Sequence, residues 1–272
     1  MALSVNTNSG AMVALQNLNS TNKQMAEVQS RINTGLKVAG PKDDGSTFAI
    51  AQNIRSDVAG LDAVKDSLNR GVSAADTAIA AGQSISDLLI EMKEKAVAAT
   101  DASLDTASRT ALSADFDALR DQISTIVSNA EFDGVNLIDG SVTNINVLAN
   151  DSGSTITVTA RELSASDGLS IQASFGLTTA TNAVQARSAV DAAIQTANSR
   201  LASLGTDAKS LEIHNDFVSQ LQDTLTEGIG NLVDADLAKE SARLQSLQIK
   251  QQLGVQALSI ANQAPQSILG LF

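Results

Sequence analysis

Several residue types are missing or scarce in this chain of 272 residues: it has no cysteine, tryptophan or tyrosine, and His214 is its only histidine. The absence of cysteine excludes disulfide bridges, thiolate catalysis and zinc held by cysteine. One histidine cannot form a histidine-based metal cluster or the His-Glu-x-x-His pattern of a metalloprotease. Aromatic residues make up only 2% of the chain, which favours thin helical cores over aromatic-lined pockets. We therefore predict a protein that is not an enzyme and that has no catalytic, cofactor-binding or metal-binding residues.

Positive charge is also scarce, because 18 Lys and Arg residues stand against 30 Asp and Glu residues, for a net charge of −12. The two ends differ from the rest: residues 1–42 carry +3 and residues 237–272 carry +2, so the middle carries −17. An acidic chain is a poor partner for nucleic acid. No apolar run approaches the roughly 18 residues of a membrane span, and residues 1–6 lack the pattern of a signal peptide. We expect no nucleic-acid partner, no membrane insertion and no cleaved signal.

Long stretches of the sequence repeat apolar residues at the three- and four-residue spacing of an amphipathic helix. Such patterns cover 11–36, 46–99, 104–129 and 190–232. The last pattern is interrupted only at Asn215 and Gln222 and predicts a helix roughly 65 Å long. A coiled-coil-like bundle can use such a helix, whereas a compact globule cannot.

The segment from 131 to about 176 has a different pattern, with Asp-Gly turn dipeptides at 133–134 and 139–140. Polar and apolar residues alternate at 142–147 and 155–159, on either side of the turn residues 150–153. This arrangement predicts a β-hairpin, and 169–173 is a candidate for one more strand.

The pattern beyond Leu232 changes phase, and we expect a hinge at 228–230. Residues 237–272 are apolar on two sides, but two paired helices bury only one stripe each. Ordering these residues costs about 1–2 kcal/mol apiece in backbone entropy. We therefore expect the ends to be frayed in the free monomer and to order when neighbouring copies cover them. The predicted polymerisation residues are Leu15, Leu18, Met25, Val28 and Ile32 near the N-terminus, and Leu237, Leu244, Leu247, Leu253, Leu258, Ile268, Leu269, Leu271 and Phe272 near the C-terminus.

Together these patterns predict a mainly α protein: an elongated antiparallel helical bundle or coiled coil with paired N- and C-terminal helices and a small β-hairpin region. The expected domains are 1–44 with 230–272, which form a terminal-helix domain for polymerisation, and 45–229, which form a helical bundle carrying the hairpin at about 132–176.

Short motifs in order along almost the whole chain resemble those of bacterial flagellin. They are SRINTGLKV at 30–38, KDD at 42–44, AIA at 49–51, GL at 60–61, NRG at 69–71, FDGVNLIDG at 132–140, QIKQQ at 248–252 and ANQAPQSIL at 261–269. The resemblance is to a short form, because about 50 residues between the third and fourth helices leave no room for large outer domains.

This resemblance implies a subunit that self-assembles into the helical filament used for swimming. It implies export of the unfolded chain through the flagellar type III pathway to an extracellular filament, without a cleaved signal. It also implies an inner layer made of both termini, an outer layer of helices, and flagellar cap and hook-junction proteins as partners. A cytoplasmic export chaperone is expected to bind the C-terminal helix.

Many flagellins resemble one another at a helical patch that an animal innate receptor, Toll-like receptor five, recognises, with the pattern Leu-Gln-Arg-Val-Arg-Glu-Leu-Ala. This chain has LIEMKEKA at 89–96. Glu91 replaces an arginine and Lys95 replaces a leucine. A planar donor group becomes an acceptor-only carboxylate, and an apolar contact becomes an ammonium group. We expect weak activation of that receptor.

The sequence leaves two alternatives to a filament subunit open. A hook–filament junction protein or another axial flagellar protein would share the terminal helices, although the motif at 261–269 favours the filament subunit. A non-flagellar, soluble coiled-coil adaptor would form a small, fixed oligomer. The number of copies per assembly separates these possibilities.

Overall fold

The computed structural model describes residues 7–269. Its helices are α1 (Ser9–Thr34), α2 (Gly45–Ala99), α3 (Thr106–Asn129), α4 (Ala180–Val233) and α5 (Leu237–Leu269). The strands are β1 (Glu131–Phe132), β2 (Val135–Asn136), β3 (Asn144–Leu148) and β4 (Thr155–Thr159). The mainly α fold is therefore confirmed. No helix within 7–269 is both long and apolar enough to cross a membrane.

The chain divides into two compact units, which share the long helices α2 and α4. The terminal unit comprises Met1–Ser56 and Thr224–Phe272, and the central unit comprises Asp57–Asp223. Each unit thus brings together segments from both halves of the sequence.

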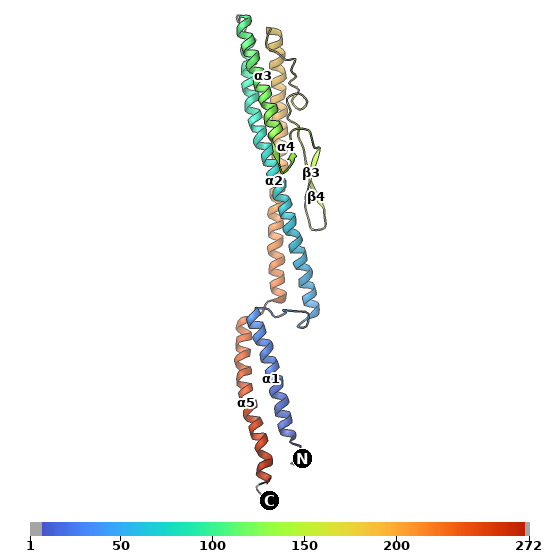
Figure 1. Cartoon of the computed structure of the whole chain (residues 1–272), viewed down its shortest axis with the longest axis vertical. Coiled ribbons are helices and arrows are strands. Elements are labelled where there is room, and N and C mark those ends of the chain that lie inside the picture. Colours follow the sequence, from blue (N-terminus) through green and yellow to red (C-terminus); the bar gives the residue numbers. More distant parts are fainter. Residues whose placement is uncertain (1–6, 270–272) are drawn as a thin grey trace. The chain divides into compact units, whose positions relative to one another are not determined.

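The terminal unit is built on α1 and α5, which lie side by side and run in opposite directions (Figure 1). Asn8 caps α1, because its side chain accepts a hydrogen bond from the Ala11 N–H at 3.0 Å. Gly35 ends the helix in the left-handed conformation (φ 72°), and its N–H donates to the carbonyl of Arg31. These two caps set the length of α1.

The central unit packs α3 against the α2–α4 pair, with β3 and β4 alongside (Figure 1). Its core holds fully buried side chains from all three helices and from the segment 137–177: Leu68, Ile85, Leu89, Met92, Phe116, Ile123, Leu137, Ile138, Leu163, Ile171, Leu177 and Leu204. Only one of these residues is aromatic, as expected for a thin helical core. The buried amide of Asn136 donates to the Val127 carbonyl at 2.6 Å and fastens the β1–β2 turn to the end of α3.

Two antiparallel strand pairs follow α3. Asp133 and Gly134 turn β1 into β2 with φ values of 51° and 79°, the positive values that a two-residue hairpin turn requires. In the second pair Asn144 lies opposite Thr159, and Leu148 lies opposite Thr155. The predicted hairpin is confirmed, with strands at 144–148 and 155–159.

The β3–β4 hairpin lies against a row of small residues on α2. The Leu148 N–H donates to Ser67 Oγ at 3.1 Å. A Cβ atom at Gly71 would lie 2.6 Å from a methyl carbon of Val147, and one at Gly60 would lie 3.0 Å from Cβ of Asp151. From the other side, Nε2 of His214 on α4 donates to the Ala149 carbonyl at 2.7 Å. The only histidine therefore has a structural role in holding the hairpin turn.

We expect Gly71→Ala and Gly205→Ala to change the free energy of unfolding in opposite directions. The new methyl group at position 71 overlaps Val147, and such overpacking costs about 1–3 kcal/mol. A Cβ at Gly205 meets no atom within 4 Å, so alanine there gains about 1 kcal/mol of helix propensity. Urea titrations of both variants measure the difference. If Gly71→Ala leaves the free energy of unfolding unchanged, the hairpin is not packed closely on α2.

The expected strand at 169–173 is wrong. Leu169 and Ile171 are both buried, but Ser170 between them adopts a φ of 57°, which interrupts an extended chain. Their N–H groups donate to the nearby carbonyls of Ser164 and Ala165. The segment is a compact loop that pins two apolar side chains into the core.

The expected hinge at 228–230 is also misplaced, because α4 continues through both glycines to Val233. The break lies at Asp234–Asp236, between α4 and α5. Glycine costs only about 1 kcal/mol inside a helix. Asp236 instead begins the next helix, as its carboxylate accepts from the Ala238 and Lys239 N–H groups at 3.1 Å.

Candidate polymerisation surfaces

The terminal unit starts from a short crossing of two connecting segments. Leu36 and Asp234 form an antiparallel bridge, and the Lys37 N–H donates to the Val233 carbonyl at 2.7 Å. Beneath this crossing Val38, Ala51 and Val233 form a small buried core, and Leu36, Phe48, Ile229 and Leu232 pack around it. Because the end of α1 and the start of α5 meet at this crossing, the two helices leave it together.

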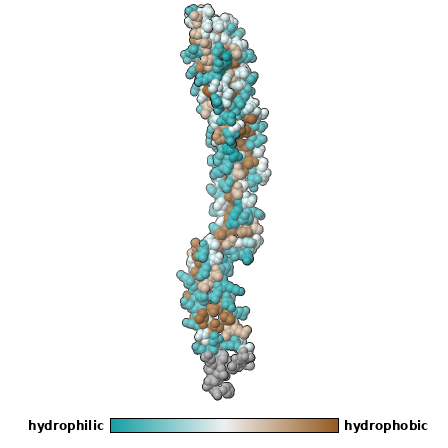
Figure 2. Space-filling view, viewed as in Figure 1, coloured by the Kyte–Doolittle hydropathy of each residue, from teal (hydrophilic) through white to brown (hydrophobic). Residues whose placement is uncertain are grey.

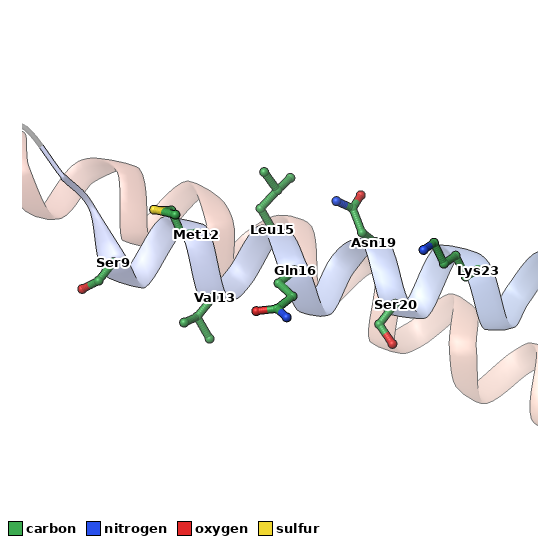
Figure 3. A pocket seen from close by; sticks show the side chains of 8 residues that line it. All are labelled: Ser9, Met12, Val13, Leu15, Gln16, Asn19, Ser20 and Lys23. Carbon is green, nitrogen blue, oxygen red and sulfur yellow. The ribbon is translucent and has the colours of Figure 1, made fainter.

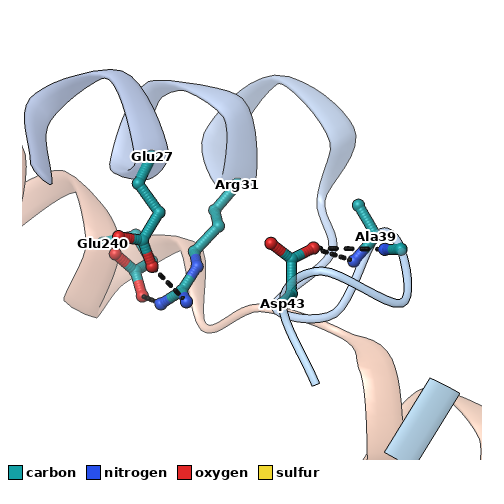
Figure 4. A network of polar contacts seen from close by, with 6 residues as sticks. Glu27, Arg31, Ala39, Asp43 and Glu240 are labelled. Carbon is teal, nitrogen blue, oxygen red and sulfur yellow. Dashed lines mark hydrogen bonds and ion pairs between the residues drawn. The ribbon is translucent and has the colours of Figure 1, made fainter. Parts of the chain in front are cut away.

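A group of three charges joins α1 to α5 near the crossing (Figure 4). The Arg31 guanidinium lies 2.6 Å from Oε1 of Glu27 and 3.3 Å from Oε1 of Glu240. Glu240 is only 8% exposed, so removing Arg31 would leave a buried acidic side chain without its partner. Further along, Gln251 donates to Asn22, and Asn8 donates to the Ala261 carbonyl. These bonds fix how α1 and α5 face each other.

The start of α2 is held by two neighbouring carboxylates. Asp43 accepts from the N–H groups of Ala39 and Gly40, as Figure 4 shows for Ala39. Asp44 accepts from the N–H of Thr47 and from the hydroxyls of Thr47 and Ser46, which lowers its pKa from 3.8 to about 2. The Asp44 carboxylate therefore stabilises the folded chain at neutral pH, and this stabilisation is lost as the pH falls from about 4 toward 2.

The predicted polymerisation residues divide into two stripes. The inner stripe lies between α1 and α5. Val28 and Leu247 are buried there at 1% and 3% exposure, and Leu18, Met25, Ile32, Leu244 and Leu258 are half-buried. Close approach at this stripe is possible because a Cβ at Gly254 would lie only 3.3 Å from Leu18.

The outer stripe faces away from the partner helix. Leu15, Leu237 and Leu253 are 48%, 50% and 57% exposed. The predicted set omitted further exposed apolar residues on the same helices: Met12, Val13, Ile249, Val255 and Ile260. The side chains of Ile268 and Leu269, and the whole of Leu271 and Phe272, lie outside the described residues. Apolar side chains gather on the surface of this unit (Figure 2).

The outer stripe of α1 borders a shallow groove. Figure 3 shows Met12 and Leu15 projecting to one side of α1 and Val13 to the other, with polar side chains further along the helix as far as Lys23. The helical periodicity of the sequence could have marked Met12 and Val13 as exposed apolar residues, since both lie outside the stripe defined by Ala11, Leu18 and Met25.

The patch at 89–96 lies on α2 within the central unit. Leu89, Met92 and Ala96 are fully buried, whereas Glu91 is exposed. The Lys95 ammonium lies 3.3 Å from Oδ2 of Asp115 on α3. Three of the eight residues in the patch are therefore core, and the two departures from the receptor pattern lie outside that core.

The described residues hold no group of three or more acidic or histidine side chains placed to bind a metal ion. What the described part of the chain offers is apolar surface on paired terminal helices, a feature of proteins that associate with copies of themselves.

Comparison with known proteins also indicates a protein that associates with copies of itself. Residues 5–143 match the bacterial flagellin N-terminal helical region, and residues 188–272 match the bacterial flagellin C-terminal helical region. Flagellin FljM of Caulobacter vibrioides is 58% identical over the full length of both chains. A flagellin of Brucella melitensis is 39% identical over 99% of both. A solved structure from Vibrio parahaemolyticus, described as a flagellar hook-associated protein, is similar in fold, with a TM-score of 0.59 and 14% identity over 71% of this chain and all of that one.

The chain is thus a structural, self-polymerising protein of the bacterial flagellum and not an enzyme. It belongs to the bacterial flagellins and is a subunit of the extracellular filament that serves motility. Its short length matches that of the Caulobacter relative, which aligns from end to end. Family membership excludes the coiled-coil adaptor, and the full-length match to flagellins favours the filament subunit over a junction protein.

Proposed function

We propose that the outer stripes of α1 and α5 form the contacts between subunits in the filament. In this proposal the terminal unit makes the inner layer and the central unit makes the outer layer. The observation that carries it is the exposure of Leu15, Leu237 and Leu253 together with five further large apolar side chains on two adjacent helices. Burying each such side chain contributes about 1.5–3 kcal/mol.

Charge supports the same assignment. The ends carry +3 and +2, whereas the rest of the chain carries −17. Copies that meet through their terminal helices keep the strongly acidic segments out of the tightest contacts, where like charges would repel. The inner stripe contributes indirectly, because it holds α1 and α5 in the arrangement that presents the outer stripe.

The same surface accounts for the proposed partners before and after assembly. Exposed apolar helices in the cytoplasm need cover, and an export chaperone that binds α5 would supply it. The chain then passes unfolded through the type III pathway and is secreted. At the growing end, the cap and hook-junction proteins would contact the same terminal helices.

Seeded growth tests this proposal directly. Purified chain is added to sheared filament fragments, and pelleted protein and filament length are measured by sedimentation and electron microscopy. We expect elongation of the seeds into long filaments. Short assemblies that stop after one layer would instead indicate a junction protein.

We also propose that the central unit is recognised weakly by the innate receptor for flagellin. Losing an anchor residue at an interface commonly costs about 2 kcal/mol, which is roughly thirtyfold in affinity. A receptor reporter assay should therefore show a stronger response to the double variant Glu91→Arg with Lys95→Leu than to the unchanged chain. Full activity of the unchanged chain, at the dose of a standard flagellin, would contradict this prediction.

A further inference from the structure

Two polar side chains occupy positions on the apolar face of α4 that the repeat otherwise gives to residues such as Leu211, Val218 and Leu225. These are Asn215 and Gln222. Both face α2 within the central unit. The Asn215 amide donates to Oδ1 of Asn69 at 2.8 Å, and the Gln222 amide donates to the Val58 carbonyl and to Oδ1 of Asp62.

The two contacts have the same register. Asn69 and Asp62 are seven residues apart on α2, and their partners Asn215 and Gln222 are seven residues apart on α4, in the opposite chain direction. Each helix therefore presents two polar groups one heptad apart, and all of them meet only in one alignment. A slip of α4 by one heptad would leave one polar group of each helix without its partner.

These bonds do not maximise stability. Oδ1 of Asn215 is buried without a hydrogen-bond partner, and a buried polar atom left unpaired is costly. Leucine at either position would extend the apolar ladder. A polar residue retained at such a position is known to select one alignment of helices at the expense of stability.

We propose that Asn215 and Gln222 set the register of α4 on α2. Without them, the register depends on the Lys93–Asp191 ion pair and on apolar packing, and we expect some chains to slip by seven residues. A single register gives every copy of the chain the same central unit, as a regular helical polymer needs.

The test uses the natural absence of cysteine, because two introduced cysteines are then the only labelling sites. Spin labels are attached to full-length chains carrying Ala80→Cys on α2 and Asp216→Cys on α4, both at exposed positions. The distance between the labels is measured by pulsed electron resonance. A slip of one heptad moves the labels by about 10 Å along the helix axis.

We expect one distance in the otherwise unchanged chain and an additional distance, about 10 Å away, in the double variant Asn215→Leu with Gln222→Leu. The control Asp223→Leu adds a leucine beside Gln222 at an exposed position and should retain the single native distance. A single, unchanged distance in the double variant would overturn the proposal, as would an added distance in the control.

Discussion

Deleting residues 237–272 should abolish filament growth while leaving the central unit folded. The deletion removes the whole of α5, and with it Leu237, Leu253 and the other exposed apolar residues of that helix. It also strips the inner stripe of α1 of its cover. The core of the central unit lies within 57–223, so it keeps all its contacts. Sedimentation after addition to filament seeds measures growth, and thermal unfolding followed by circular dichroism measures folding.

The matched control for this deletion is the full-length chain taken through the same purification. Elongation of seeds by the truncated chain would refute the assignment of α5 to the subunit contacts. Loss of the cooperative unfolding transition would instead show that the central unit depends on the terminal helices.

Two substitutions on α5 should impair assembly for different reasons. Leu247→Asp places a carboxylate at a position that is 3% exposed, which costs several kcal/mol if the group stays charged. We expect α1 and α5 to separate in the monomer, with faster hydrogen exchange in both helices. Leu253→Asp changes a side chain that is 57% exposed, so the monomer should change by less than about 0.5 kcal/mol. Seeded growth should be lost in both variants.

Gln252→Asp is the control, because it adds the same charge at an exposed neighbour of Leu253 without removing an apolar side chain. It should assemble far better than Leu253→Asp. Equal assembly of Leu253→Asp and the unchanged chain would remove this residue from the proposed contacts. If instead hydrogen exchange in α1 and α5 is already fast in the unchanged monomer, the prediction that the ends are frayed before assembly is supported.

Helices α1 to α4 were predictable because their apolar residues repeat without a proline to interrupt them. The observed bounds of α2 and α3 lie within two residues of the expected ones. The strand at 169–173 was predicted from local alternation, which cannot reveal the left-handed conformation of Ser170. The hinge was placed at two glycines, whereas the break depends on the bridge between Leu36 and Asp234, a contact between distant parts of the sequence.

For the candidate site, the sequence identified apolar residues on the terminal helices but not which of them face the partner helix. Val28 and Leu253 are both apolar residues of terminal helices, yet one is buried and the other exposed. The difference depends on how α1 and α5 are rotated against each other, which Arg31, Glu240 and the Asn22–Gln251 bond determine. Such polar contacts between the two ends of the chain leave no periodic signal.

The turn of the β3–β4 hairpin combines a firmly attached base with an open tip. Ala149 and Asp151 touch α4 and α2, but Ser152 and Gly153 are exposed, and a Cβ at Gly153 would meet no atom within 4 Å. Exposed tips of this kind are where chains tolerate added residues. A short peptide inserted between Ser152 and Gly153 would be carried by every subunit, so a foreign epitope placed there would be displayed as a dense, regularly spaced array.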